Sequence, residues 1–297
     1  MKDLCKCDVG DKELLALFCT KRESWKEQLV GETDLSIQGQ IELMLWDDRV
    51  FYAFHKAYGK CEKGARNLWK RHAPSEGVPM SMVNLWERSY VEKQHMAIRR
   101  LVDRDCSGGA VSLFALLDNI QNHKHLFTRE NYVCYDGLPY DQNSASADKA
   151  AAKIAGRHDT YDQISGKSCS SRSRLDPVDD GYFKKTKDEF GAFERVRNVA
   201  NKFIAHAAPI KSVKVDMQYQ DIEGVVREFD KCYKGLMGIA KRISILIDEM
   251  ITPVSCSNLR QFDGVDMPIL TRDDHRRLDS YWGSREEQIQ KWLDDPI

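Results

Sequence analysis

One short run of this chain, residues 200–206, gathers side chains that can transfer protons and contact phosphate. His206 supplies an imidazole whose pKa lies near neutrality, so it suits proton transfer as a general base or general acid. Asn201 supplies an amide that can position a substrate, and Lys202 supplies a cation for phosphate oxygens. Cleavage of RNA by its own 2′-oxygen needs two proton transfers and a cation on the transition state, with no metal or other cofactor.

The residue six positions before His206, next to Asn201, is Ala200, which carries no charge. Six positions of an α-helix turn about 600°, so side chains at 200 and 206 lie about 120° apart. Two such helices from two subunits can close a site that neither completes alone. Arg197 lies about 900° of turn before His206 and therefore faces the opposite side. It is a candidate RNA contact, and it does not replace an arginine at 200.

Simpler interpretations exist for the same residues. A histidine near a helix end is commonly structural, and a lysine on a helix commonly lies in solvent. The combined run Asn-Lys-Phe-Ile-Ala-His followed by Pro209 is a more specific pattern than either residue alone.

The elements that must position this run are helical. Apolar residues recur at three- and four-residue steps along most of the chain, which is typical of amphipathic helices. Glycine, proline and serine mark two loops, residues 132–143 and a mobile connection at 165–180, and only 211–217 alternates weakly like a strand. We expect an all-α protein built around an up-and-down helical bundle. The expected helices span residues 11–30, 34–61, 80–104, 113–120, 145–164, 183–208, 221–251 and 272–293.

Two parts of unequal size are expected. Residues 1–254 form a helical domain that contains the motif helix, 183–208, and residues 255–297 form a C-terminal arm with one helix. In the loop at 165–180, basic residues either touch RNA or simply lie in solvent. These residues are Lys167, Arg172 and Arg174.

Composition bounds the environment of the protein. The 297 residues carry a formal net charge of -1 and are 42% hydrophobic and 31% charged, which fits a globular protein without a global pull toward nucleic acid. No apolar run is long enough to span a membrane, and the first residues lack the apolar region of a secretion signal. The nine cysteines are odd in number and sparse, and Cys5 and Cys7 have no second pair that would complete a zinc site. We expect a cytoplasmic protein with reduced thiols and no membrane partner.

Three segments of the chain together resemble one known family. The run at 200–206 matches the ribonuclease motif of HEPN domains, in which an arginine and a polar residue precede a histidine, except that alanine holds the arginine position. Residues 97–103, Ala-Ile-Arg-Arg-Leu-Val-Asp, and 111–117, Val-Ser-Leu-Phe-Ala-Leu-Leu, resemble helices of the abortive-infection U-type HEPN family. The resemblance covers residues 35–250 in the same order.

The resemblance implies a fold and a function. It implies a HEPN-like bundle that forms a homodimer with a composite active site, and a metal-independent RNA endonuclease that leaves a 2′,3′-cyclic phosphate. The setting that it implies is a toxin–antitoxin or anti-phage abortive-infection system. A partner such as a nucleotidyltransferase-type antitoxin, or another defence protein, would then be expected.

Ala200 departs from the family pattern and leads us to expect an inactive chain. Alanine preserves the helix and removes only the cation, as a deliberate substitution in a toxic ribonuclease would, but natural loss of activity gives the same residue. Two other functions remain open. One is a non-catalytic HEPN module that binds a partner protein or nucleic acid, and the other is a helical scaffold with no role in nucleic-acid binding.

Overall fold

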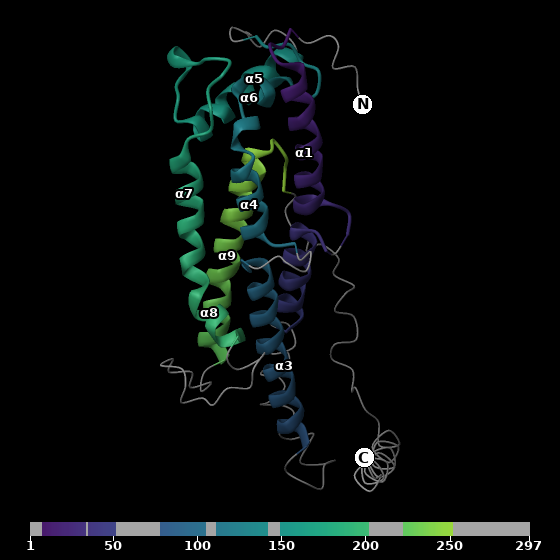
Figure 1. Ribbon diagram of the computed structural model, residues 1–297. Coiled ribbons are helices and arrows are strands. Elements are labelled where there is room, and N and C mark those ends of the chain that lie inside the picture. Colours follow the sequence, from purple (N-terminus) through teal and green to yellow (C-terminus); the bar gives the residue numbers. More distant parts are fainter. Residues whose placement is uncertain are drawn as a thin grey trace, which may run out of the picture. The chain divides into compact units, whose positions relative to one another are not determined.

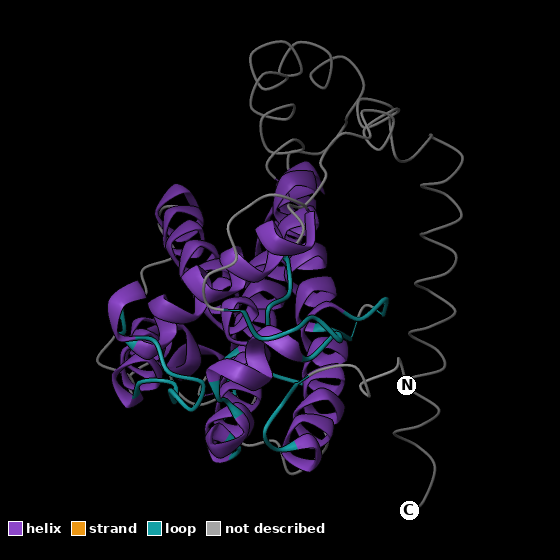
Figure 2. Ribbon diagram, turned by 90° about the horizontal axis from the view of Figure 1, so that it is seen from above, coloured by secondary structure: helices purple, strands orange, loops and turns teal. Residues whose placement is uncertain are grey.

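The computed structural model describes residues 8–33, 35–51, 78–104, 111–141, 149–201 and 222–251. These residues contain helices and no strand, as Figure 2 shows, so the expected all-α class is confirmed for this part of the chain. An isolated antiparallel bridge joins Thr128 to Pro177. The expected C-terminal arm, 255–297, lies outside the described residues.

The helices follow the sequence pattern closely in most places. Residues 37–51 are helical, and the remainder of the helix expected at 34–61 lies outside the described residues. The further elements, in chain order, are α1 (Lys12–Val30), α3 (Val78–Leu101), α4 (Leu113–Asn122), η2 (Lys124–Leu126), α5 (Arg129–Cys134), α6 (Lys149–Ser165), η3 (Cys169–Ser171), α7 (Asp180–Asp188), η4 (Glu189–Phe193), α8 (Glu194–Val199) and α9 (Ile222–Leu246). Helix α9 contacts α3, α4, α6 and the 3₁₀ helix η4, so it lies at the centre of the group that Figure 1 shows.

Side-chain caps set the starts of several helices. Asp11 accepts a hydrogen bond from the Leu14 amide at 2.8 Å, and Ser112 accepts one from the Ala115 amide at 3.1 Å. These bonds satisfy amides that have no partner within the helix, and the two helices begin within one residue of the starts expected at 11 and 113. The loop expected at 132–143 is wrong in its first part, because α5 continues to Cys134. All six residues of α5 are buried, so tertiary packing outweighs the weak local signal.

The apolar face of α9 forms much of the core. Phe229, Leu236, Ile239 and Ile243 are fully buried and belong to one cluster with side chains from α1, α3, α4 and α7. Burial of each such side chain contributes about 1.5–3 kcal/mol. The stripe that predicts this helix from sequence is therefore also the stripe that holds the bundle together.

The motif helix expected at 183–208 is not one continuous α-helix, which corrects the sequence-based expectation. Helix α7 passes into the 3₁₀ helix η4 and then into α8, and the winding widens to a π turn at residues 200–201. Within η4, Phe190 and Phe193 are both buried at a step of three. A step of three keeps a 3₁₀ helix, but not an α-helix, facing the same way.

The connection at 165–180, which the sequence predicts to be mobile, makes tertiary contacts with the body of the protein. The amide of Asp179 donates to the carbonyl of Ile164 at 2.9 Å, and the side chain of Asp176 is buried. Buried polar groups keep their partners because an unpaired one is costly. Carboxylates also hold two of its three basic residues, because Arg172 contacts Asp162 at 2.7 Å and Arg174 contacts Glu130 at 2.8 Å.

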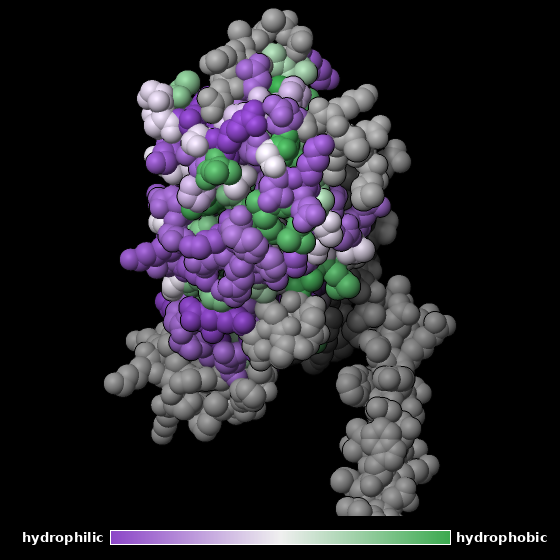
Figure 3. All heavy atoms as spheres, turned by 45° about the horizontal axis from the view of Figure 1, so that its top comes forward, coloured by the Kyte–Doolittle hydropathy of each residue, from purple (hydrophilic) through white to green (hydrophobic). Residues whose placement is uncertain are grey.

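The face of the molecule drawn in Figure 3 is mainly polar. Figure 3 shows hydrophilic side chains over most of the drawn face, with smaller hydrophobic patches between them. No helix within the described ranges combines the length and the apolar character needed to cross a membrane.

Candidate functional site

The position expected to carry an arginine is buried. Ala200 follows the last residue of α8, has 0% of its surface exposed, and donates its amide hydrogen to the carbonyls of Val196 and Arg197. Helix α8 packs against α3. An arginine at 200 would have to direct its guanidinium out of the core or find an anionic partner inside it.

Asn201 and Arg197 lie on either side of this buried position. Asn201 is half-buried within the π turn. Arg197 pairs with Glu194 of its own helix at 2.9 Å, where the carboxylate side chain is 57% exposed. Such a surface pair contributes about 0.3–0.5 kcal/mol and exchanges readily with solvent. Arg197 thus remains available for an anion, but its charge is partly neutralised.

His206 and Lys202 lie outside the described residues. The structure therefore places Ala200, Asn201 and Arg197 of the expected site, and the roles assigned to the other two residues stay predictions.

A second histidine lies deep in the helices near α8. His95 of α3 is 3% exposed, its Nδ1 lies 2.8 Å from the carbonyl of Val91, and its ring contacts Phe229 with 4.9 Å between centroids. Burial lowers the pKa of His95, so its neutral form is favoured. Arg195 and Glu228, 3.3 Å apart, lie close enough to influence that pKa. The burial makes His95 a packing residue and not a proton donor to a bound polymer.

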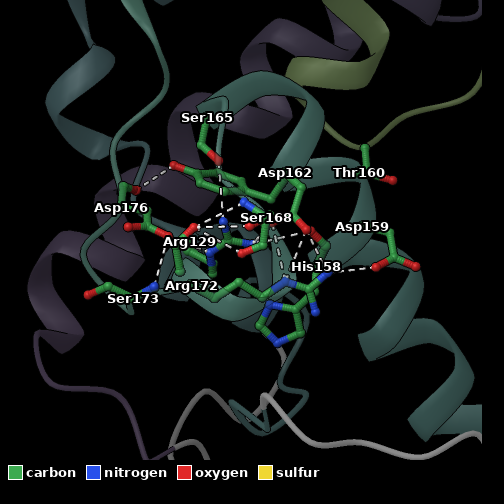
Figure 4. Close-up of polar contacts among 12 residues, drawn as sticks. Arg129, His158, Asp159, Thr160, Asp162, Ser165, Ser168, Arg172, Ser173 and Asp176 are labelled. Carbon is green, nitrogen blue, oxygen red and sulfur yellow. Dashed lines mark hydrogen bonds and ion pairs between the residues drawn. The ribbon is translucent and has the colours of Figure 1, made fainter.

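A buried ion-pair network that the sequence did not predict closes the segment 166–179 onto α5 and α6. Arg129 is fully buried and contacts Asp162 at 2.8 Å and Asp176 at 2.9 Å (Figure 4). Arg172 contacts Asp162 at 2.7 Å and Asp159 at 2.7 Å. Burial alone would raise the pKa of Asp162, but hydrogen bonds from Arg172 and Arg129 lower it. Two guanidinium groups meet three carboxylates here, and the carboxylate in excess is that of Asp159, whose side chain is 71% exposed. Each buried charge has a partner, so the network is structural.

His158 lies beside this network (Figure 4). Its Nε2 is 3.1 Å from the carbonyl of Asp141, and its Nδ1 is buried without a hydrogen-bond partner. Burial lowers the pKa of His158, and the charges of Arg172 and Arg129 lower it further. The arrangement favours a neutral imidazole that packs against Tyr140, with 5.3 Å between ring centroids.

A second network surrounds the end of α9. Tyr135 lies between two guanidinium groups, that of Arg22 at 3.9 Å and that of Arg157 at 4.1 Å from its ring centroid. Its hydroxyl donates to Asp248 at 2.8 Å, and Arg157 also contacts Asp248 at 2.8 Å. Asp248 has a φ of 49°, a conformation that costs energy for a non-glycine residue. These contacts hold the strained residue in place and end α9.

A signal for these networks was present in the sequence. Arg22 lies between Phe18 and Trp25 at helical spacing, and Arg157 lies between Ile154 and Tyr161. An arginine within an apolar stripe either ends the stripe or is buried with a carboxylate. The carboxylates that pair with Arg157 are those of Asp248 and, at 2.6 Å, Asp136. Both lie outside its helix, and no local pattern identifies them.

A third group of polar side chains links residues 37–51 with α3 and α9. Asp48 accepts hydrogen bonds from the hydroxyls of Tyr90 and, at 3.4 Å, Tyr233. Tyr233 also donates to Gln94 at 3.0 Å. Burial raises the pKa of Asp48. These contacts join three helices through polar groups, of which Gln94, Tyr90 and Tyr233 are buried and Asp48 is half-buried.

In the ranges that the structure describes, no three His, Cys, Asp or Glu side chains are grouped so that they could hold a metal ion. Comparison with known proteins adds no relative: no family model matches this chain, and neither does a curated protein or a solved structure. The resemblance to the HEPN family therefore depends on the sequence segments alone.

Proposed function

We propose that this chain is a HEPN-type protein that binds RNA and does not cut it. The parent activity would be that of a metal-independent RNA endonuclease of a toxin–antitoxin or anti-phage abortive-infection system. Two copies would form a homodimer with a composite site. In that site His206 would transfer protons, Asn201 would position the substrate, and Lys202 and Arg197 would contact phosphate.

One observation carries this proposal. The helix widens to a π turn at Ala200 and Asn201, immediately before the run that ends in His206. Single π turns are frequent at functional sites, where they change the direction of the following side chains. At the same place Ala200 is buried, so the position that a ribonuclease would fill with a cation is apolar here. Loss of such a transition-state donor lowers the rate by about 10²–10³.

The test restores the cation. Ala200→Arg should yield cleavage of single-stranded RNA to 2′,3′-cyclic phosphate ends, together with growth arrest on induction in a host. His206→Ala in the same background should abolish both. Circular dichroism and the mass in solution must show a folded protein, because an arginine at a buried position can destabilise the bundle. A folded, dimeric Ala200→Arg protein that cuts no RNA would overturn the catalytic part of the proposal.

A second measurement does not depend on that variant folding. The unaltered chain should bind single-stranded RNA, and the exchange Lys202→Gln with Arg197→Gln should weaken the binding. Arg88→Gln serves as a control, because Arg88 is a largely exposed arginine that pairs with Glu92 on α3. No measurable binding by the unaltered chain would overturn the RNA-binding part.

A second candidate function is a module that binds a partner protein, such as an antitoxin. Leu43 and Trp46 lie three residues apart on the helix at 37–51 and are 45% and 43% exposed. Exposed apolar side chains that share a helix face are a common feature of protein interfaces. On this alternative, Leu43→Ser with Trp46→Ser should remove a stoichiometric partner and leave RNA binding unchanged. Leu17→Ser is the control, since Leu17 is 45% exposed on α1.

A further inference from the structure

A groove lies on the described surface between α7 and α9. It has a volume of about 760 Å³, and its walls are one face of each helix together with the end of α6. Helix α7 contributes Tyr182 and Lys185, and α9 contributes Gly238, Lys241 and Arg242. Residues spaced by three or four along a helix share a face, which explains why each helix lines the groove with a stripe.

The charges in the groove are unequally paired. Glu189 is held by Arg242 at 2.9 Å, and Asp179 accepts a hydrogen bond from the amide of Gly181 at 3.1 Å. Lys185 and Lys241 are exposed and have no carboxylate partner among the described residues. Arg242 thus offsets Glu189, whereas Asp179 keeps its negative charge. The groove lining still has an excess of positive charge, and its two ammonium groups stand on opposite walls where they can meet an anion.

The floor of the groove is also open on the α9 side. A Cβ added at Gly238 would meet no atom within 4 Å. The glycine thus leaves room above α9 for another molecule. Tyr182 lines the opposite wall, and its hydroxyl donates to the carbonyl of Arg242 at 3.0 Å. This contact and its packing against the core hold the tyrosine in the wall, so the groove offers positive charge for a nucleic-acid backbone and not a ring for base stacking.

We infer that this groove binds the phosphates of single-stranded RNA, with Lys185 and Lys241 contacting the backbone from its two walls. This inference rests on the proposed function and assigns RNA to a surface outside the motif. Helix α7 leads through η4 into α8. Lys185 lies roughly 22–30 Å along this helical run from Ala200, at about 1.5–2.0 Å per residue. A strand held in the groove therefore lies within a few nucleotides of the motif end.

The test compares two pairs of neutralised lysines in the full-length chain. Lys185→Gln with Lys241→Gln should weaken binding of a labelled single-stranded RNA of about 12 nucleotides on the order of tenfold. The slope of log affinity against log salt should become shallower by about 1.4. Lys184→Gln with Lys234→Gln is the matched control, because both lysines are exposed on the same helices and neither lines the groove. This control should bind as the unaltered chain does.

A steric variant tests the same groove without changing charge. Gly238→Phe places a ring in the open space, and it should weaken RNA binding while Gly238→Ala leaves binding unchanged. An excess of adenosine monophosphate should not displace the RNA, because one phosphate reaches one wall only.

The possible results distinguish a failure of the proposed groove from a failure of the proposed function. If the two double substitutions weaken RNA binding equally, or if neither weakens it, the groove is not the binding surface. The proposed function would still stand. Displacement by the mononucleotide also overturns the groove, because the site would then be one for a small nucleotide. Absence of RNA binding by the unaltered chain overturns the groove and the proposed function together.

Discussion

Arg129 and Asp176 form a buried ion pair at 2.9 Å although 47 residues separate them along the chain. Neither side chain is more than 7% exposed. The pair ties the segment before α7 to α5, and Asp176 also holds the amide of Ser173 at 2.8 Å. The start of the run that leads to the motif is therefore fixed by this contact.

Loss of the buried cation should strongly destabilise the protein. Arg129→Met leaves Asp162 and Asp176 without their shared partner, and removal of one member of a buried pair costs about 3–5 kcal/mol. Urea unfolding should show this loss. Arg197→Met removes a surface pair and should cost less than about 1 kcal/mol. Equal effects of the two substitutions would show that the Arg129 network does not support the fold.

Stability should fall in acid in two stages. His158 and His95 have lowered pKa values, so the unfolded chain takes up their protons first as the pH falls below about 6.5. Asp136 has a pKa of about 2, because Arg157 and Lys153 outweigh the effect of burial. Its contribution is present above about pH 3.9 and is lost as the pH falls toward 2.

The first stage can be assigned by substitution. The free energy of unfolding of His158→Gln, measured in urea at several pH values, should depend less on pH between about 7.5 and 5 than that of the unaltered chain. His125→Gln is the control, because His125 is exposed. An unchanged slope in His158→Gln would contradict the assignment.

Two glycines of α9 should respond oppositely to alanine. Gly238→Ala meets no atom within 4 Å and should stabilise the helix by roughly 0.5–1 kcal/mol. At Gly235 an added Cβ would lie 2.9 Å from Cζ of Phe193, whose ring is buried. Overpacking of this kind typically costs about 1–3 kcal/mol, so Gly235→Ala should lower the melting temperature while Gly238→Ala raises it. Two shifts of the same sign would contradict this packing.

An arginine should be harder to accommodate at position 200 than at the exposed position 198. Ala200 is fully buried, whereas Asn198 two residues earlier is exposed. Ala200→Arg should lower the free energy of unfolding by about 1–3 kcal/mol or more, because the longer side chain overpacks the core. Asn198→Arg should change it by less than about 0.5 kcal/mol. Calorimetry on both variants tests this, and a neutral Ala200→Arg would show that the core opens readily toward solvent here.

The sequence by itself determined most of the helices. Asp11 and Ser112 cap helices where their residue types predict, and the apolar stripe of α9 is the one that is buried. These features depend on contacts within one or two turns, so local spacing is enough to encode them. The pattern of α5 was too short to be recognised, and the step of three between Phe190 and Phe193 was mistaken for ordinary α-helix.

Tertiary structure alone decided which charges are paired and which are not. Arg172 was expected in a solvated loop, but it is bound to Asp159 and Asp162, while Lys185 and Lys241 are left free to line a groove. It also decided that Ala200 is buried. These facts depend on residues brought together from distant parts of the chain. Electrostatic pairing and burial act through space, and sequence spacing does not record them.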